Sequence, residues 1–452
     1  MAGKVIDMTE GSILKSVFHF AIPVMLTNML QMVYHMADLI TVGRFAGADA
    51  MASVGATSGV NGMLLNLFIG LSAGSCVLAS RRFGARDNDG LHRVIHTSMF
   101  LAIITSVFGL ILSQSLIRTV LEYMGTPEGA VLEGATAYLR IIFWGTPAIL
   151  VYNFSAAIIQ GLGDTKTPFY ILAVTGLINV VFNLIFVIVF KLGVAGVAYS
   201  TIMANYLSAA AVVIYLMRAD ESYRLKIKKL KLYKNEVINI IKIGLPTGFQ
   251  GMVVGFANST IQSGVNSFGS AAVAGSAAAE AIENLIYHSM YGFAHGAVTG
   301  VSQNYGAKNK YRIKKFIYVP ILCAVVVGIV LAVIALCFTR PLLSIYITDS
   351  PAAMDFGVIR MKIVISLYFI IGIMEVLGGV LKGLGHTGII FFNYTVGYCC
   401  TSVGWITLIL PLKRIPEILF LCCPVAWTVV IIFNLVALML VWKRTIKKMM
   451  DA

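Results

Sequence analysis

The feature that most constrains this chain is a succession of apolar stretches, each long enough to cross a lipid bilayer. A membrane-spanning helix needs about 20 mostly apolar residues, and lipid cannot satisfy the free backbone groups of any other open structure. Only 12% of the residues are charged and 58% are hydrophobic. A soluble protein of 452 residues could not cover its surface with so few charged residues. The sequence therefore predicts an all-α, polytopic membrane protein with twelve transmembrane helices. The predicted spans are 16–42, 52–79, 94–115, 137–160, 167–190, 194–217, 240–266, 272–302, 316–338, 357–381, 388–410 and 417–441.

The basic residues predict how these spans are oriented. The formal net charge is +14, from 34 Lys and Arg against 20 Asp and Glu. With a cytoplasmic amino terminus, 25 of the 34 basic residues fall on the cytoplasmic side. By the positive-inside rule we expect a multi-pass protein of the cell (inner) membrane with both termini in the cytoplasm. The basic stretch 218–242 could instead bind anionic lipid or nucleic acid. A connector between two halves explains it better, and we expect no nucleic-acid partner.

The second half of the chain repeats the first at one nearly constant offset in numbering. Residues 161–165 (GLGDT) match 383–387 (GLGHT), and residues 83–86 (FGAR) match 305–308 (YGAK). Each half holds six spans, an even number, so both halves cross the membrane in the same direction. Two such halves around a central cavity suit alternating access by rocking, and they argue against a simple channel or a membrane enzyme. The expected parts are an N-terminal six-helix lobe (1–217), a basic cytoplasmic linker (218–239) and a C-terminal six-helix lobe (240–452).

A few polar residues inside the predicted spans are candidates for ion coupling, because an ionisable group in a membrane is costly. Asp38 lies in the outer part of the first span, where its carboxyl needs a proton or a cation. Asn179 and Asn183 are four residues apart, and so on one helix face, at a similar depth in the fifth span. Thr201 lies near that level in the sixth span, and Asn153 joins from nearer the cytoplasm. These groups suit a small cation such as Na⁺ or a network that tunes a proton site, although they could also only hold helices together.

The acidic residues of the C-terminal half predict a substrate cavity. Glu375 stands at the repeat position of Asn153, so the two halves differ in charge there. We interpret Glu283 and Glu375 as cavity carboxylates that attract a cationic substrate. The alternative for Glu375 is pairing with a neighbouring basic or polar group. Glu280 lies close enough to the outer end of its span to be solvated.

With these residues in view, the chain resembles the multidrug and toxic compound extrusion (MATE) family over essentially its whole length. The resemblance implies twelve helices in two six-helix lobes. It also implies export of mostly cationic amphipathic compounds, driven by inward flow of sodium ions or protons. Members of the family have an acid in the first helix and amides in the fifth, and the arrangement of Asp38 with Asn179 and Asn183 resembles theirs. The markers are residues 21–23 (AIP), 37–38 (AD), 42–44 (VGR), 303–307 (QNYGA) and the two GLG-x-T turns at 161–165 and 383–387.

One departure from the family pattern concerns the seventh helix. Some members carry an acid there for sodium binding, whereas residues 246–264 contain none, which puts a sodium site in the C-terminal lobe in doubt. We expect a monomer whose partners are small cationic molecules and the lipid bilayer, with no cofactor besides the coupling ion. No catalytic constellation is visible, and the seven cysteines lack C-x-x-C spacing. The alternative function is a flippase for a lipid-linked precursor, although such flippases usually add two helices and a cationic cavity.

Overall fold

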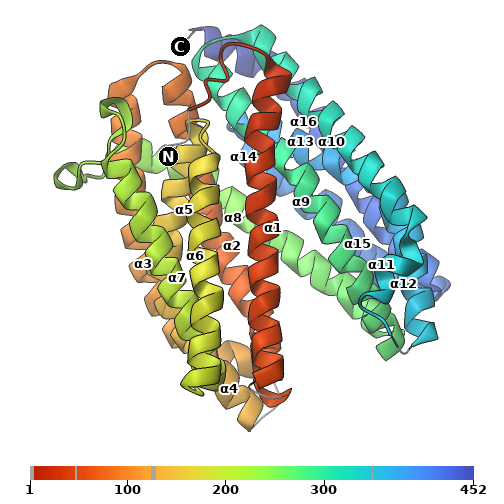
Figure 1. The fold of residues 1–452 in the computed structure, drawn as a ribbon. Coiled ribbons are helices and arrows are strands. Elements are labelled where there is room, and N and C mark those ends of the chain that lie inside the picture. Colours follow the sequence, from red (N-terminus) through yellow and green to blue (C-terminus); the bar gives the residue numbers. More distant parts are fainter. Residues whose placement is uncertain (1–4, 46–47, 124–128, 349, 452) are drawn as a thin grey trace. The chain divides into compact units, whose positions relative to one another are not determined.

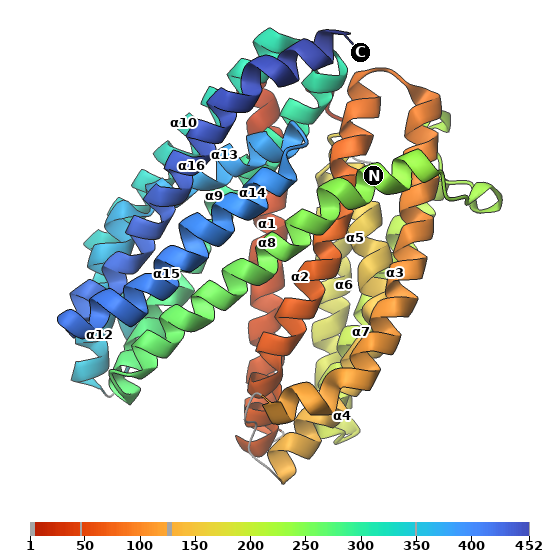
Figure 2. The same ribbon diagram turned by 180° about the vertical axis from the view of Figure 1, so that it is seen from behind.

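The computed structural model describes residues 5–45, 48–123, 129–348 and 350–451, and its regular structure in these ranges is helical throughout, with no strand. Figure 1 shows the chain as a ribbon and Figure 2 shows it from behind. The helices of the first half are α1 (Ile13–Phe45), α2 (Ala48–Gly84), α3 (Asn88–Tyr123), α4 (Ala130–Trp144), α5 (Thr146–Gly161), α6 (Lys166–Leu184), the π-helical η1 (Ile185–Val189) and α7 (Gly193–Met217). Short 3₁₀ turns η2 (Glu221–Tyr223) and η3 (Ile227–Lys229) follow in the basic linker.

The helices of the second half follow the same order as those of the first. They are α8 (Lys234–Asn266), α9 (Ser270–Gly306), α10 (Lys310–Cys337), α11 (Thr339–Ser344), α12 (Pro351–Val364) with η4 (Ile365–Leu367), and α13 (Phe369–Gly383). The eleventh span consists of α14 (Thr387–Tyr394), η5 (Thr395–Cys400), α15 (Thr401–Gly404), η6 (Trp405–Ile409) and η7 (Leu410–Leu412), and α16 (Pro416–Asp451) is the last helix. In both halves the fifth span of the repeat contains π-helical turns, so the repeat extends to this backbone irregularity.

The prediction of twelve membrane spans is confirmed. Among the described residues, eight single helices are long and apolar enough to cross a membrane, and two bent helix pairs bring the number to ten. The remaining two spans are α2 and α9, which are 37 residues long each. They are rich in Gly, Ala and Ser, and these small residues contribute little to hydropathy.

The fourth and tenth spans, each predicted as one span, are bent in the structure. The axes of α4 and α5 differ by 46°, and those of α12 and α13 differ by 48°. Gly145 lies in the first break and Pro147 follows in the first turn of α5. A proline suits the first turn of a helix but cannot continue the helix before it. The second break, at Tyr368, lies within one residue of the repeat position of Gly145, so both halves carry the bend.

By packing, the chain forms two compact units whose boundaries fall inside helices. Unit 1 comprises Met1–Ile6 and Leu26–Gly248, and unit 2 comprises Asp7–Met25 and Phe249–Ala452. The first turns of α1 thus pack with unit 2, and the first half of α8 packs with unit 1. The predicted boundaries at residues 217 and 240 divide the chain by its sequence repeat, not by packing. They stay a prediction.

Within unit 1, α2 and the first half of α8 approach each other closely through small residues. Gly70 of α2 and Gly248 of α8 meet backbone to backbone, and Gly74 of α2 faces the backbone of Ile240. A Cβ atom added to Gly244 would lie 2.6 Å from the carbonyl oxygen of Leu71. Small residues four apart allow this kind of close helix contact in membranes.

Replacing Gly244 by valine is therefore expected to destabilise the protein by about 1–3 kcal/mol, because the added side chain must push two helix backbones apart. The measurement is the midpoint of thermal unfolding of the purified protein in detergent. Gly255→Val is the matched control, since Gly255 is on the same helix and a Cβ there would meet nothing within 4 Å. Equal losses in the two variants would contradict the close-packing explanation.

Candidate functional site

The polar residues predicted on three helices of unit 1 come together around Asp38. Asp38 extends from α1, Asn179 and Asn183 from α6, and Ser200 and Thr201 from α7, and we call these five residues the Asp38 cluster. The Asn183 amide donates to Asp38 Oδ1, and Asn183 Oδ1 accepts from the Ser200 hydroxyl. The Asn179 amide is oriented so that both of its ends have a partner. In this orientation Nδ2 donates to Asp38 Oδ1 at 3.2 Å, and Oδ1 accepts from the Thr201 N–H at 3.3 Å. The carboxyl thus links α1 to α6, and the amides link α6 to α7.

The local structure of α6 explains why both amides face Asp38. Asn179 and Asn183 are separated by four residues, which places them one above the other on one helix face. Both are buried, with 5% and 1% of their surface exposed, so their polar groups need partners inside the protein. The π-helical segment η1 begins two residues after Asn183. π-helical turns occur frequently at functional sites, and here the wider turn begins where the polar layer ends.

An apolar layer lies one helical turn from the Asp38 cluster, on α1, on η1 directly after α6, and on α7. Three buried valines form it, and the ring of Tyr138 from α4 packs against them. We call these valines the valine layer, and each is four residues from a cluster member: Val42 from Asp38, Val187 from Asn183 and Val197 from Thr201. The layer lies toward the carboxyl end of α1, one turn beyond the polar cluster. A bare charge beside such a layer is costly, so the Asp38 carboxyl depends on the amides that bind it.

Asn153, which was predicted as a fifth coupling residue, makes no hydrogen bond to the Asp38 cluster among the described residues. Its Nδ2 donates to the carbonyl oxygen of Ile149 at 2.8 Å, one turn earlier on α5. An asparagine inside a helix can satisfy its amide in this local way. The structure therefore brings together Asp38, Asn179, Asn183 and Thr201, and it leaves Asn153 bonded within its own helix.

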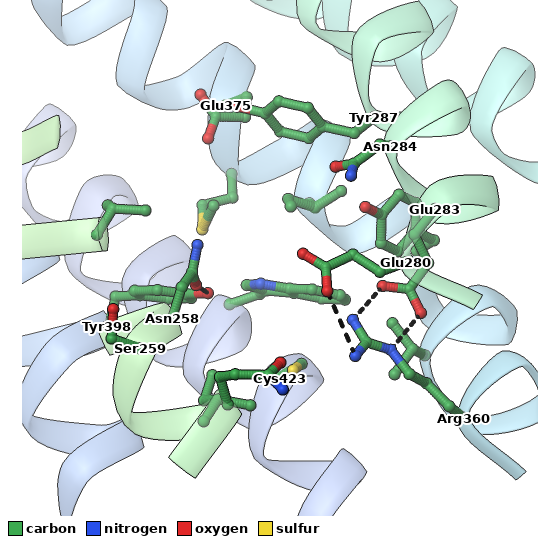
Figure 3. A pocket seen from close by; sticks show the side chains of 18 of the residues that line it. Asn258, Ser259, Glu280, Glu283, Asn284, Tyr287, Arg360, Glu375, Tyr398 and Cys423 are labelled. Carbon is green, nitrogen blue, oxygen red and sulfur yellow. Dashed lines mark hydrogen bonds and ion pairs between the residues drawn. The ribbon is translucent and has the colours of Figure 1, made fainter. Parts of the chain in front are cut away.

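A second polar region is a cavity of about 580 Å³ inside unit 2 (Figure 3). Three carboxyls and one guanidinium line it: Glu280 and Glu283 from α9, Arg360 from α12 and Glu375 from α13. Aromatic side chains form much of the remaining wall, namely Tyr287, Tyr368, Tyr394, Tyr398 and Trp427. The cavity thus offers both charged groups and flat apolar surfaces within one partly open space.

Glu283 is paired with Arg360 rather than free in the cavity. The Arg360 Nε and one terminal nitrogen donate to the two Glu283 carboxylate oxygens, both at 2.8 Å. The other terminal nitrogen lies 3.8 Å from a Glu280 oxygen, as Figure 3 shows. The side chains of Arg360 and Glu283 are only 11% and 6% exposed, whereas that of Glu280 is 51% exposed. Of the two acids predicted to attract a cation, Glu283 therefore already has a cation beside it.

Glu375 lies apart from the Arg360 pair, near the ring of Tyr287 (Figure 3). The hydroxyl of Tyr394 lies beside the Glu375 carboxyl. The cavity therefore holds three carboxyls in different surroundings: Glu283 is neutralised by a bidentate ion pair, Glu375 is surrounded by tyrosines, and Glu280 is half exposed.

Two residues of these sites, Ser200 and Arg360, were not predicted from the sequence. Ser200 directly precedes Thr201, and its hydroxyl donates to Asn183 Oδ1. Adjacent residues on a helix face different directions. The sequence does not show which of the two points inward. Arg360 was treated only as one of the nine basic residues that do not fall on the cytoplasmic side, since 25 of the 34 do. A signal was present, because Arg360 lies inside the predicted span 357–381, where an unpaired charge is costly.

Comparisons with known proteins relate the chain to one family. The MatE family model matches residues 23–185 and 246–404, one match in each half. The probable multidrug resistance protein YpnP of Bacillus subtilis is 28% identical over 388 residues, covering 84% of this chain and 85% of that protein. The probable multidrug resistance protein YoeA of the same organism is 26% identical over 351 residues, covering 75% of each. A crystal structure of MATE in complex with MaL6 superposes with a TM-score of 0.90 at 21% identity, over 99% of this chain and 100% of that one. The predicted resemblance and the predicted twelve-helix, two-lobe fold are confirmed.

Proposed function

The chain belongs to the MatE family, and on that premise we propose that it exports cationic amphipathic compounds across the membrane in exchange for protons. It is a transporter rather than an enzyme, and it acts as a monomer in the cell (inner) membrane with both termini in the cytoplasm. The names of the two Bacillus subtilis relatives, both probable multidrug resistance proteins, support the substrate class. The distribution of basic residues supports the orientation.

The observation that carries this proposal is the hydrogen-bonding pattern of the Asp38 cluster. Hard metal cations are held by several oxygen ligands at once. Both asparagine oxygens of the cluster are already occupied, one by the Ser200 hydroxyl and the other by the Thr201 N–H, and both amide nitrogens face Asp38. Each amide oxygen thus already accepts a hydrogen bond, and the Asp38 carboxyl is the ionisable group of the cluster, which favours a proton over a metal cation. This pattern supports a proton as the coupling ion in our proposal, and that ion is a transported species rather than a resident cofactor.

Protonation of Asp38 would change the contact between α1 and α6. The amides of Asn179 and Asn183 both donate to the Asp38 carboxylate. Hydrogen bonds to an ionised acceptor are roughly twice as strong as neutral ones, so a proton on Asp38 weakens both. The proton thus loosens the link between the two helices, and its release restores the link. This two-state contact is the element through which proton binding drives alternating access.

The cavity of unit 2 supports the substrate part of the proposal. The tyrosine and tryptophan rings of its wall suit the flat apolar part of an amphipathic compound, and their faces attract a cation. Glu375 and the partly exposed Glu280 supply negative charge, because neither carboxyl is held by Arg360 in a bidentate ion pair. A substrate with an aromatic body and a positive charge fits this combination.

The experiment that tests the coupling ion is ethidium transport by the purified protein in proteoliposomes. We expect a pH gradient to drive transport in buffers free of sodium, and a sodium gradient at equal pH to drive none. The reason is that the Asp38 cluster presents one ionisable carboxyl, while each of its amide oxygens already accepts a hydrogen bond. Ethidium fluorescence reports transport in both arms, and protein-free liposomes give the background.

Transport driven by sodium alone would overturn proton coupling while leaving the export function intact. Failure of the wild-type protein to move any of several cationic dyes, under either gradient, would overturn the substrate class. That result would favour the flippase function, which is then tested with a fluorescent lipid-linked precursor in the same liposomes.

A further inference from the structure

The Arg360 guanidinium is a buried cation for which the export scheme above gives no role. It is held by both oxygens of Glu283, at 2.8 Å each, and it lies 3.8 Å from Glu280. Its side chain is 11% exposed, although it lines a cavity. A surface ion pair would face water, whereas this one is placed where a transported compound has to fit.

The sequence repeat relates the surroundings of Arg360 to those of Asp38. With the offset that aligns the two GLG-x-T turns, Arg360 stands at the repeat position of Tyr138 and Cys423 at that of Thr201. Tyr138 packs against the valine layer and lies close to Asp38. Cys423 lies close to Arg360 and lines the cavity with it. In the repeat of unit 2, the guanidinium therefore occupies the region that corresponds to the Asp38 cluster of unit 1.

The acid and the amides of that cluster have no counterparts in unit 2. The repeat positions of Asp38, Asn179 and Asn183 are occupied by Thr260, Thr401 and Trp405. The carboxylate of this region comes instead from Glu283 of α9, and the positive charge comes from Arg360 of α12. Unit 2 thus contains an acid together with a cation that is part of the chain.

A guanidinium differs from a coupling ion because it cannot leave. Arginine keeps its proton under all conditions met by proteins, and its planar fork matches both oxygens of a carboxylate. A carboxylate held in this way needs neither a proton nor a substrate cation to be satisfied. Among the described lining residues, Glu280 and Glu375 are then the carboxyls left for the charge of a bound compound.

We propose that Arg360 is a specificity-determining residue, a built-in cation that occupies Glu283 and lowers by one the positive charge that the cavity accepts. The inference rests on the proposed function, because it concerns the charge of a cationic substrate. It adds to that function the residue that selects between compounds with one and with two positive charges.

The test compares the binding of two dyes to purified protein in detergent. Ethidium and propidium share one aromatic ring system, and they carry one and two positive charges respectively. Fluorescence titration gives the ratio of the propidium Kd to the ethidium Kd. Arg360→Gln frees Glu283, and we expect this ratio to fall at least about tenfold, because a second charge then gains a buried acceptor. Glu283→Gln leaves Arg360 without its acid, and we expect the ratio to rise.

Two further variants separate charge from structure. Arg360→Gln combined with Glu283→Gln has the same net charge in the cavity as the wild type, and its ratio is expected to return to within about threefold of the wild-type value. Arg360→Lys keeps the cation and should keep the ratio. A ratio unchanged in both Arg360→Gln and Glu283→Gln, with ethidium still bound, would overturn the inference alone. Binding of neither dye by the wild type would overturn the proposed substrate class and the inference together.

Discussion

Asp38→Asn is expected to abolish ethidium transport driven by a pH gradient, to the level of protein-free liposomes. Asparagine matches aspartate in shape but cannot bind and release a proton, so the contact between α1 and α6 can no longer alternate between two strengths. The side chain also loses the negative charge that the amides of Asn179 and Asn183 face. The measurement is the initial rate of dye movement after a pH jump.

The control for this variant is Asp89→Asn, which removes a carboxyl of equal size from an exposed position in the first turn of α3. This control is expected to transport at the wild-type rate. Asp38→Glu retains a proton-binding carboxyl, so it should retain part of the rate. Undiminished transport by Asp38→Asn would contradict the coupling role of the Asp38 cluster.

Arg360→Met is expected to cause the largest loss of stability, about 3–5 kcal/mol, because it leaves a buried carboxylate without its cation. The methionine fills a similar volume, so the loss reflects the charge of Glu283 rather than an empty space. The midpoint of thermal unfolding in detergent gives the order of the variants, and titration with a denaturing detergent gives the free-energy difference.

Removing both partners should recover most of that stability. In Arg360→Met combined with Glu283→Leu no buried charge is left unpaired, and apolar replacements of a buried ion pair are often neutral. The matched surface control is Arg118→Met, which breaks an exposed pair with Glu122 on α3 and should produce no measurable loss. Equal stability of Arg360→Met and Arg118→Met would show that the Arg360–Glu283 pair is not buried as described.

Much of the Asp38 cluster could be predicted because it depends on distances along single helices. The four-residue spacing of Asn179 and Asn183 places them on one face whatever the rest of the fold does. The depth of Asp38 follows from its position along the first span, because each helical residue advances the chain by a fixed rise. Thr201 was placed in the same way from the opposite end of its span. The structure brings these four residues together, and their coupling role stays a prediction.

The Arg360–Glu283 pair could not be predicted in this way. Its partners are 77 residues apart on helices whose rotation about their own axes is set by packing. The same reason applies to Ser200, whose direction the spacing of α7 leaves undetermined, and to Asn153, which bonds to Ile149 of its own helix. A carboxyl in a membrane span marks a site, but only its neighbours show whether it is free or already neutralised.

The amino-acid pattern alone predicts that the chain crosses the membrane twelve times, that its halves repeat and that Asp38 lies at the depth of the amides of the fifth span. These properties follow from bilayer thickness and helix periodicity, which act along one dimension. The folded protein is needed to see that Glu283 is held by Arg360, that the fourth and tenth spans bend, and that a valine layer lies one turn from Asp38. Such features depend on how helices rotate and pack against each other, and a linear pattern does not contain that information.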